Sequence, residues 1–226
     1  MEAVNPVDQW GLHVMNFIQL KKLPNLLIAP DFLNASQVRT IPIVPVPGSV
    51  VRNCTLNVKR FIEANGGSAQ YGWAISALGN VLVRFVGHCV ARQESGELIC
   101  VTPSECSYLD EIAFIPDQSI APIDQGLERL PSITIPLINN SIAAEYADLD
   151  NVSSKIKSKY PSRISLDDNR SSTPLTKEDS ELVVDATMRA RRLMPVLQAL
   201  VARTYGPNQY CFCNSGKKYK KCCKQT

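Results

Sequence analysis

Four of the eight cysteines in this 226-residue chain lie within its last sixteen residues. They are spaced as Cys-x-Cys, eight intervening residues and Cys-Cys, at Cys211, Cys213, Cys222 and Cys223. The intervening segment begins with Asn214-Ser215-Gly216, residue types that favour a turn, so all four sulfur atoms can meet at one point. Four thiolates at one point form the closed tetrahedral shell that a structural zinc ion prefers. The spacing therefore predicts one structural Zn²⁺ site.

Two disulfides, as in a secreted miniprotein, are the alternative for these cysteines. Residues 1–8 contain no basic segment followed by an apolar core, so no secretory signal is visible. Clustered cysteines in a chain of this size then favour a metal site in a reducing compartment. No window of about twenty uninterrupted apolar residues occurs, so we expect no membrane span. We therefore expect a cytoplasmic protein.

The cysteine-rich tail resembles the SEC-C zinc motif, which is best known from the C-terminus of the bacterial preprotein translocase motor subunit. The resemblance rests on the cysteine spacing, on the terminal position and on Ser215-Gly216-Lys217-Lys218-Tyr219-Lys220-Lys221. Phe212 and Asn214 stand where Pro and Gly are usual, and neither position supplies a ligand. The resemblance implies a metal ion held by the four cysteines and docking of the tail to a protein partner.

The formal net charge of +3 is unevenly distributed along the chain. Residues 206–226 hold five lysines and no acid, so residues 1–205 sum to −2. Because zinc with four thiolates carries −2, the loaded tail has a charge of about +3. This charge suits an acidic protein surface, anionic lipid headgroups or a nucleic-acid backbone, or it offsets the thiolates. Nucleic acid is the weaker alternative partner, with Phe212 and Tyr219 available for base stacking.

A second group of residues could do chemistry in the first half of the chain. Cys54 is expected in the first turn of a helix over residues 53–65, where free amides and the helix dipole favour a thiolate. His88 is expected on a strand, from which a general base can reach the end of a packed helix. A Cys–His pair needs a third group that orients the imidazole.

Three interpretations of Cys54 and His88 remain open. Cys54 shares a helix face with Val58, Phe61 and Ile62, so it is also read as a small buried hydrophobe. The second interpretation is a thiol hydrolase or acyltransferase. The third is a second metal site, with ligands drawn from Cys54, His88, Cys89 and Cys100. Neighbouring strand residues point to opposite faces, which argues against joint ligation by His88 and Cys89.

The same region resembles a family of small, poorly characterised bacterial proteins, and its order of functional groups is similar to papain-like and transglutaminase-like thiol folds. The motifs that carry the resemblance are Cys54-x-x-Asn57-Val58, Gly66-Gly67, Tyr71-Gly72-Trp73-x-Ile75, His88-x-Val90 and Gly96-x-Leu98-x-x-Val101-Thr102-Pro103. It implies Cys54 as nucleophile and His88 as base. The family often has acids where this chain has Val86 and Cys100. Asp110 and Asp117 are the remaining candidates for an orienting carboxylate.

These motifs lie in a predicted α+β body over residues 1–150, with a papain-like or transglutaminase-like helix-plus-antiparallel-sheet order. A polar linker over 151–175, a C-terminal helix over 176–205 and the zinc tail over 206–226 follow. Within these limits the patterns predict a helix over 7–23, an extended edge segment over 40–47, the helix over 53–65, and strands near 71–75, 81–92, 97–102, 112–115 and 132–135. Pro195 predicts a kink or break in the last helix.

Two functional hypotheses follow from the sequence. In the first, the zinc tail docks the chain to a protein partner and the α+β body binds a ligand or a partner without chemistry. In the second, the body is a cysteine-dependent hydrolase or acyltransferase using Cys54 and His88, and the tail recruits it to substrate. Selective alkylation of Cys54 below pH 7 distinguishes the two.

Overall fold

The chain folds as an α+β protein in which three helices pack against a seven-stranded sheet whose strand pairs are all antiparallel. The computed structural model describes residues 17–24, 26, 30–33, 37–104, 109–122, 129–160, 162–164, 170–172, 174–211, 216–222 and 224. The elements in chain order are β1 (Ile18–Gln19), β2 (Arg39–Pro42), α1 (Cys54–Asn65), β3 (Ser68–Leu78), β4 (Leu82–Arg92), β5 (Leu98–Ile99), β6 (Glu111–Pro116), η2 (Gln118–Ile120), β7 (Ser132–Pro136), α2 (Ser141–Ser158), β8 (Ser162–Ile164), β9 (Arg170–Ser172), α3 (Lys177–Thr204) and η3 (Tyr219–Lys221).

The hairpin of β3 and β4 forms the centre of the sheet. Its register places Gly72 opposite His88 and Leu78 opposite Leu82. Gly79 in the turn has φ +56°, and a Cβ built there would lie 2.5 Å from Val201 of α3, so no larger residue fits. The strand order is β2-β6-β3-β4-β5, with β1 added to β3 and β7 added to β4.

The two ends of this order meet, so the sheet closes into a small barrel. Ile43, just after β2, pairs in parallel with Cys100, just after β5. The Cys100 amide donates to Pro42 O at 2.9 Å, and Cys100 O accepts from the Val44 amide at 2.8 Å. The barrel encloses an apolar cluster of Ile41, Ala74, Val90, Leu98, Cys100, Ile112 and Phe114. The closure therefore fixes the backbone of Cys100 and puts its side chain among inward-facing residues.

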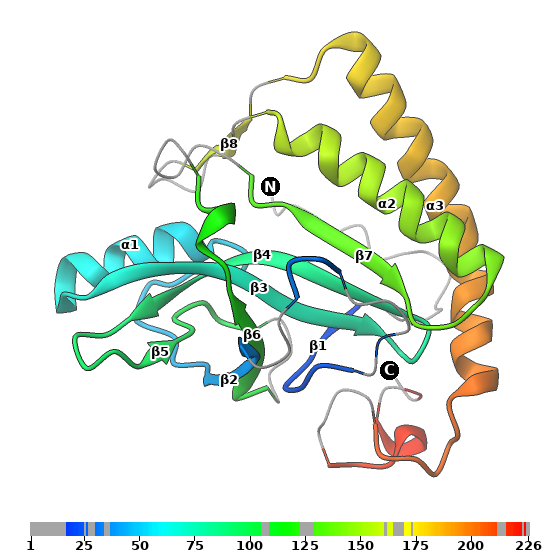
Figure 1. Ribbon diagram of the computed structural model, residues 1–226, viewed down its shortest axis with the longest axis horizontal. Coiled ribbons are helices and arrows are strands. Elements are labelled where there is room, and N and C mark those ends of the chain that lie inside the picture. Colours follow the sequence, from blue (N-terminus) through cyan, green and yellow to red (C-terminus); the bar gives the residue numbers. More distant parts are fainter. Residues whose placement is uncertain are drawn as a thin grey trace, which may run out of the picture.

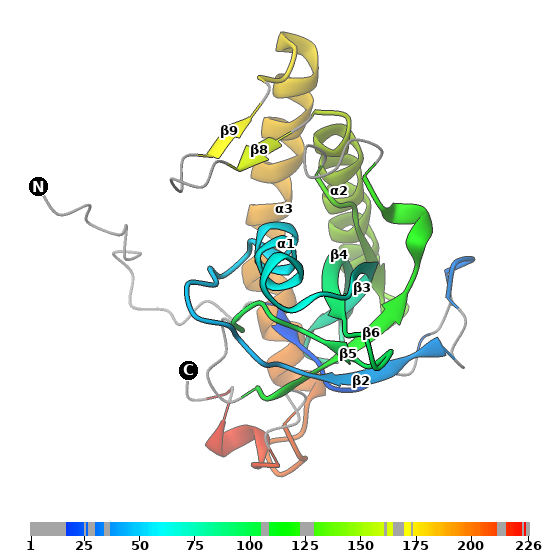
Figure 2. The ribbon, with the colours of Figure 1, turned by 90° about the vertical axis from the view of Figure 1, so that its left-hand side faces the viewer.

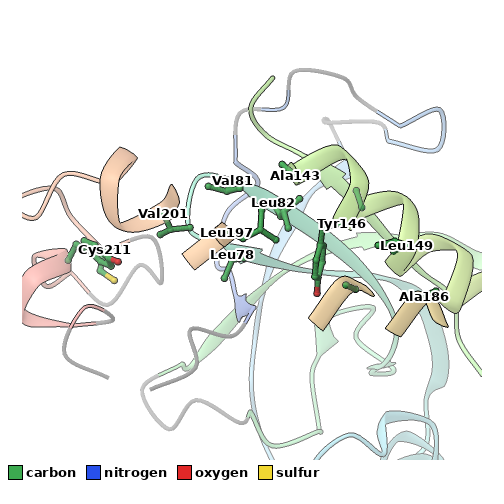
Figure 3. Packing of buried hydrophobic residues seen from close by; sticks show 13 residues of the cluster. Leu78, Val81, Leu82, Ala143, Tyr146, Leu149, Ala186, Leu197, Val201 and Cys211 are labelled. Carbon is green, nitrogen blue, oxygen red and sulfur yellow. The ribbon is translucent and has the colours of Figure 1, made fainter. Parts of the chain in front are cut away.

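The helices pack in two groups (Figure 1). The first helix, α1, lies along β4 and β3, and its Val58 and Phe61 pack on Cys89 and Ala91. The other two helices, α2 and α3, lie side by side, and α2 also contacts β7. Figure 3 shows the core between these helices and the β3–β4 turn, formed by residues that include Leu78, Leu82, Ala143, Tyr146, Leu197 and Val201.

The C-terminal tail belongs to this last cluster. It lies at the C-terminal end of α3, away from β8 and β9 (Figures 1 and 2). Tyr219 is 1% exposed and packs edge-on against Tyr205 at a centroid distance of 5.0 Å. The tail is therefore packed against the body and does not hang free from it.

Several predicted elements are confirmed. The helix at 53–65 is α1, with Asn53 as N-cap and Gly66 as C-cap. The strands predicted near 71–75, 81–92, 112–115 and 132–135 are parts of β3, β4, β6 and β7. The extended segment contains β2, the first strand of the order, which pairs with β6 and, beyond its end, with Cys100 through the bridge at Ile43. The C-terminal helix is α3, whose N-cap Thr176 accepts from the Asp179 amide.

Three predictions about elements are wrong in part. Residues 17–23 of the predicted first helix are not helical, because Ile18 and Gln19 form β1 beside β3; residues 7–16 lie outside the described residues. The predicted linker begins inside α2, whose Asn140 N-cap accepts from the amides of Ile142 and Ala143. The last helix continues through Pro195, because Leu197 and Val201 anchor its second half in the core. None of the described helices is long and apolar enough to cross a membrane.

Candidate active site

Cys54 is the first residue of α1 and is half-buried. Its neighbour Asn53 makes no side-chain cap bond, and the first turn of α1 contains no acidic residue. The amides of this turn are therefore not bonded by the N-cap side chain, and no carboxylate competes with a thiolate for the positive end of the helix dipole. The position stabilises Cys54 in its reactive, ionised form.

Asn57 holds the loop that leads into this helix. Its side-chain amide donates to Val50 O at 2.7 Å and to Thr102 Oγ1 at 3.1 Å. Its side-chain oxygen accepts from the Val50 amide at 3.0 Å. Asn57 is fully buried, so one asparagine ties the loop before Cys54, the helix and the strand end after Cys100 into one rigid unit.

His88 lies on β4, on the strand face that also carries Val90 and points into the barrel. Its Nε2 lies 3.2 Å from Cys100 Sγ. The Cys100 thiol in turn lies 3.5 Å from Thr102 O, to which it donates. Cys100 therefore occupies the place of the third group that orients a catalytic imidazole, as a thiol instead of a carboxylate.

The Cys54 thiol and the His88 imidazole lie close enough for each to shift the pKa of the other. Burial alone would raise the pKa of Cys54, but the His88 charge, together with hydrogen bonds from His88, the Cys89 amide and Thr55, lowers it below its ordinary value. Burial alone would lower the pKa of His88, but the charges of Cys54 and then Cys100 raise it well above its ordinary value. Both shifts favour the ionised forms of the pair, the Cys54 thiolate and the His88 imidazolium.

Cys89 provides the contrast one residue along the same strand. It is 1% exposed and packs under α1, on the opposite face of β4 from His88. Burial and then the Cys54 charge raise the pKa of Cys89, although the nearby Tyr71 hydroxyl acts in the opposite direction. Burial likewise raises the pKa of Tyr71. Cys89 is therefore an inert core thiol, and only Cys54 of this pair is suited to act as a nucleophile.

A cavity of about 300 Å³ opens onto the pair. Its apolar wall includes Phe17, Ile75 and Val86, and its polar wall includes Ser76 and Thr102. The Arg84 guanidinium lies over the Phe17 ring, 3.8 Å from its centre, and also pairs with Asp150 at 2.9 Å. The Phe17 wall of the cavity is therefore held by a side-chain network that extends to α2.

The other candidate acids lie elsewhere. Asp110 forms an ion pair with Lys21, and Asp117 accepts from the Trp73 indole at 2.8 Å and caps η2. Neither is bonded to His88. Among the residues that the structure describes, no group of three or more Cys, His, Asp or Glu side chains is arranged to hold a metal ion. The structure thus brings together Cys54, His88 and Cys100, and it separates Cys89 from them.

Two of the four predicted zinc ligands lie in the described part of the tail. Cys211 is buried and Cys222 is half-buried, and both belong to the same apolar cluster. A short hairpin brings these chain segments together: Tyr210 pairs with Lys218, and the Cys211 amide donates to Lys217 O at 2.7 Å. Cys213 and Cys223 lie outside the described residues.

Tyr219 also corrects one expectation about the tail. The sequence offered it as a base-stacking side chain, but it is buried against Tyr205 and cannot stack on a nucleic acid. Phe212, the other aromatic residue, lies outside the described residues.

Sequence reasoning also left the roles of Asn57 and Thr55 unassigned. The Cys54-x-x-Asn57 spacing was the available signal for Asn57, since it places the asparagine one turn after the cysteine.

Comparisons with known proteins identify no relative of this chain. No family model matches it, and neither a curated protein nor a solved structure does. Its function must therefore be argued from the site itself.

Proposed function

We propose that the body of this protein is a cysteine-dependent acyl-transfer enzyme, a hydrolase or an acyltransferase, with Cys54 as nucleophile and His88 as general acid and base. The observation that carries the proposal is the position of the imidazole: it lies close enough to Cys54 to lower the pKa of that thiol, its Nε2 lies 3.2 Å from Cys100 Sγ, and Cys54 and His88 line one cavity. A structural thiol needs neither a charged partner nor an opening to a cavity.

Cys54 and His88 together can account for every bond and proton of the acyl transfer. The Cys54 thiolate attacks the carbonyl carbon of the substrate and forms a C–S bond, while the electron pair of the carbonyl moves to its oxygen. As the carbonyl re-forms, the bond to the leaving group breaks and the His88 imidazolium gives its proton to that group. Water or another nucleophile then attacks the thioester, gives its proton to His88 and releases the Cys54 thiolate.

The N-terminus of α1 supports the same proposal. The Cys54 amide is the first of the helix and has no acceptor within the helix. It is placed to donate to the oxyanion that forms on the substrate carbonyl, and such a donor typically contributes about 3 kcal/mol to transition-state stabilisation. Cys100 orients the imidazole as a weaker acceptor than a carboxylate, so we expect slow turnover.

An activated ester tests the proposal. On incubation with p-nitrophenyl acetate we expect a burst of about one p-nitrophenolate per chain and an acetyl group that peptide mapping places on Cys54. Cys54→Ala removes both, whereas Cys89→Ala, which deletes the neighbouring inert thiol, leaves both. Acetylation that persists in Cys54→Ala, or a folded protein without a burst, would contradict the proposal.

We also propose that the tail is a structural zinc site that docks the chain to a protein partner. The pairing of Tyr210 with Lys218, and the packing of Cys211 and Cys222 in one apolar cluster, support the metal site because they bring the two cysteine-bearing segments into the same part of the fold. Such a site would be held by Cys211, Cys213, Cys222 and Cys223. The described lysines of the tail are all exposed while Tyr219 is buried, so the positive charge faces outward, toward an acidic partner. Pull-down by acidic partner candidates should weaken when these lysines are replaced by Gln.

A further inference from the structure

An apolar side chain on the central strand β4 is exposed beside Cys54 and His88. Val86 is 37% exposed, whereas every other residue of β4 is buried or half-buried. Its backbone pairs on both sides, with Ala74 of β3 and Ser132 of β7, so this is not the exposure of a sheet edge. Val86 lines the cavity, and its exposed side chain forms part of the cavity wall.

Apolar residues from three other segments complete this wall. Val51, in the loop before α1, is 38% exposed, and Phe17 and Pro103 line the cavity from the segments before β1 and after β5. A valine that is exposed at a cavity loses nothing by contact with an apolar ligand and gains from the removal of water. The wall is therefore suited to an apolar group.

Most polar groups of the wall are already bonded within the protein. Besides His88, the polar residues that line the cavity are Gln19, Arg52, Ser76, Thr102 and Ser104. Ser76 Oγ donates to Arg84 O at 3.4 Å, and Thr102 Oγ1 accepts from the Asn57 side chain at 3.1 Å. Arg52 and Ser104 also interact with other groups of the protein. A polar ligand would compete with these interactions, whereas an apolar chain would not.

The size of the cavity limits the length of such a chain. A volume of about 300 Å³ lies at the lower end for ligand cavities. Each methylene group that moves from water to an apolar wall strengthens binding by about fourfold. A short alkyl chain can therefore add a large factor to the rate of acylation before the cavity is full.

We infer that Cys54 accepts acyl groups with a short apolar chain, and that Val86 is a specificity-determining residue that contacts this chain. The inference rests on the proposed function, since it names the substrate class of the same site. Val86 does not touch the reacting bond, and it acts by removing the chain from water.

Two activated esters that differ in chain length test the inference in the whole protein. The second-order rate of p-nitrophenolate release is measured with p-nitrophenyl acetate and with p-nitrophenyl hexanoate, and peptide mapping locates the acyl group. The readout is the ratio of the hexanoate rate to the acetate rate, divided by the same ratio for N-acetylcysteine, which corrects for intrinsic reactivity. We expect a corrected ratio of about ten or more, with the acyl group on Cys54.

Two substitutions at Val86 test its contact with the chain. Val86→Thr keeps the shape of the side chain and replaces one methyl group by a hydroxyl, so it should lower the corrected ratio by about threefold. Val86→Trp fills part of the cavity and should remove the preference for hexanoate. Val152→Thr is the matched control, because Val152 is an exposed valine of α2 that does not line the cavity; its ratio should equal that of the natural protein.

Two results would overturn the inference and leave the proposed function intact. One is a smaller corrected ratio in the natural protein while both esters acylate Cys54. The other is a ratio that neither Val86 variant changes, which would show that the chain lies elsewhere. Failure of both esters to acylate Cys54 would instead overturn the proposed function, and the inference with it.

Discussion

The chain contains two cysteine sites that differ in what holds them together. In the body, Cys54 and Cys100 contact His88 within a closed barrel and a helix that are tied by hydrogen bonds of buried groups. In the tail, Cys211 and Cys222 pack in one apolar cluster with Tyr219, on a short segment held by main-chain hydrogen bonds such as that from the Cys211 amide to Lys217 O. The body site is thus complete without a metal ion, whereas the proposed tail site depends on one for most of its folding energy.

The comparison shows how surroundings decide the role of a cysteine. An imidazolium balances one thiolate and leaves it accessible from a cavity, which suits reaction. Four thiolates around a zinc ion are satisfied by the ion and lose their reactivity, which suits structure. Cys89, buried next to Tyr71 with a raised pKa, represents the third outcome, a thiol that only fills space.

Loss of the metal should give the largest difference between the two sites, because the tail should unfold and the body should not. Treatment with a strong chelator, or Cys222→Ser, should release about one zinc ion per chain and unfold the tail, because a structural zinc contributes on the order of 10 kcal/mol. Elemental analysis and hydrogen exchange of the Tyr219 amide measure these changes. Alkylation of Cys54 should continue at nearly the same rate.

The control for the tail is Cys100→Ala, which removes a cysteine from the body and should keep the zinc. A metal-free protein whose Tyr219 amide stays protected would contradict the zinc proposal. A parallel loss of Cys54 reactivity would show that the two sites do not fold independently, against the contrast drawn above.

Asn57→Ala should destabilise the body without changing the tail. It leaves Val50 and Thr102 without their buried partner, and such a loss costs about 3 kcal/mol. Urea unfolding measures the fall in the free energy of unfolding. Asn65→Ala is the comparison, because the Asn65 side chain makes one bond, to Phe61 O, near the end of the same helix; its effect should be below about 1 kcal/mol. Equal effects of the two substitutions would argue against the proposed role of Asn57 in holding the loop, the helix and the strand end together.

His88→Gln should remove the charge that lowers the pKa of Cys54. Because burial then dominates, the pKa of Cys54 should rise to its ordinary value or above, and less than about 1% of the thiol is then ionised at pH 6. We expect the iodoacetamide rate at pH 6 to fall at least about a hundredfold, and to approach that of the natural protein at pH 9.5. A rate at pH 6 that survives the substitution would assign the activation of Cys54 to the helix terminus instead.

Cys100→Asp should have the smallest effect, and in the opposite direction. A carboxylate next to Nε2 stabilises the imidazolium more than a thiol does, so the pKa of His88, already raised, should rise further by about one unit or more. The chain has two histidines, so the ring signals of His88 can be followed by NMR. Cys100→Ser, whose hydroxyl is not charged, should instead let the pKa of His88 fall, because Cys100 contributes to its rise. A fall in this pKa with Asp would mean that Cys100 does not face the imidazole.

The sequence predicted the placement of Cys54 and His88 on their elements better than it predicted the elements around them. Cys54 at a helix start and His88 on a strand followed from local patterns, namely the Asn53 cap, the Gly66-Gly67 stop and the β-rich run of β4. The sequence did not predict that His88 and Cys100 lie on the same face of the sheet. That arrangement depends on the register of β5 and on closure of the barrel at Ile43.

Long-range packing also decided the elements that were missed. Residues 18–19 belong to the segment 7–23, whose apolar residues recur at helical spacing. They form β1 instead, because β3 offers a free edge at that point. The serine and lysine content of residues 151–158 indicated a linker, but Tyr146, Leu149 and Ile156 supply α2 with enough apolar surface to pack. The composition of a segment does not show which contacts a neighbouring helix will add, here those between α2 and α3.

The central claim is that Cys54 is a thiolate paired with an imidazolium, and the pH dependence of its alkylation tests this claim most directly. Because the pKa of Cys54 is lowered and that of His88 is raised, both shifts favour the charged pair near neutral pH. The iodoacetamide rate at Cys54 should therefore change by less than about threefold between pH 6 and pH 8. A rate that rises about tenfold per pH unit over this range, as for an ordinary thiol, would contradict the claim.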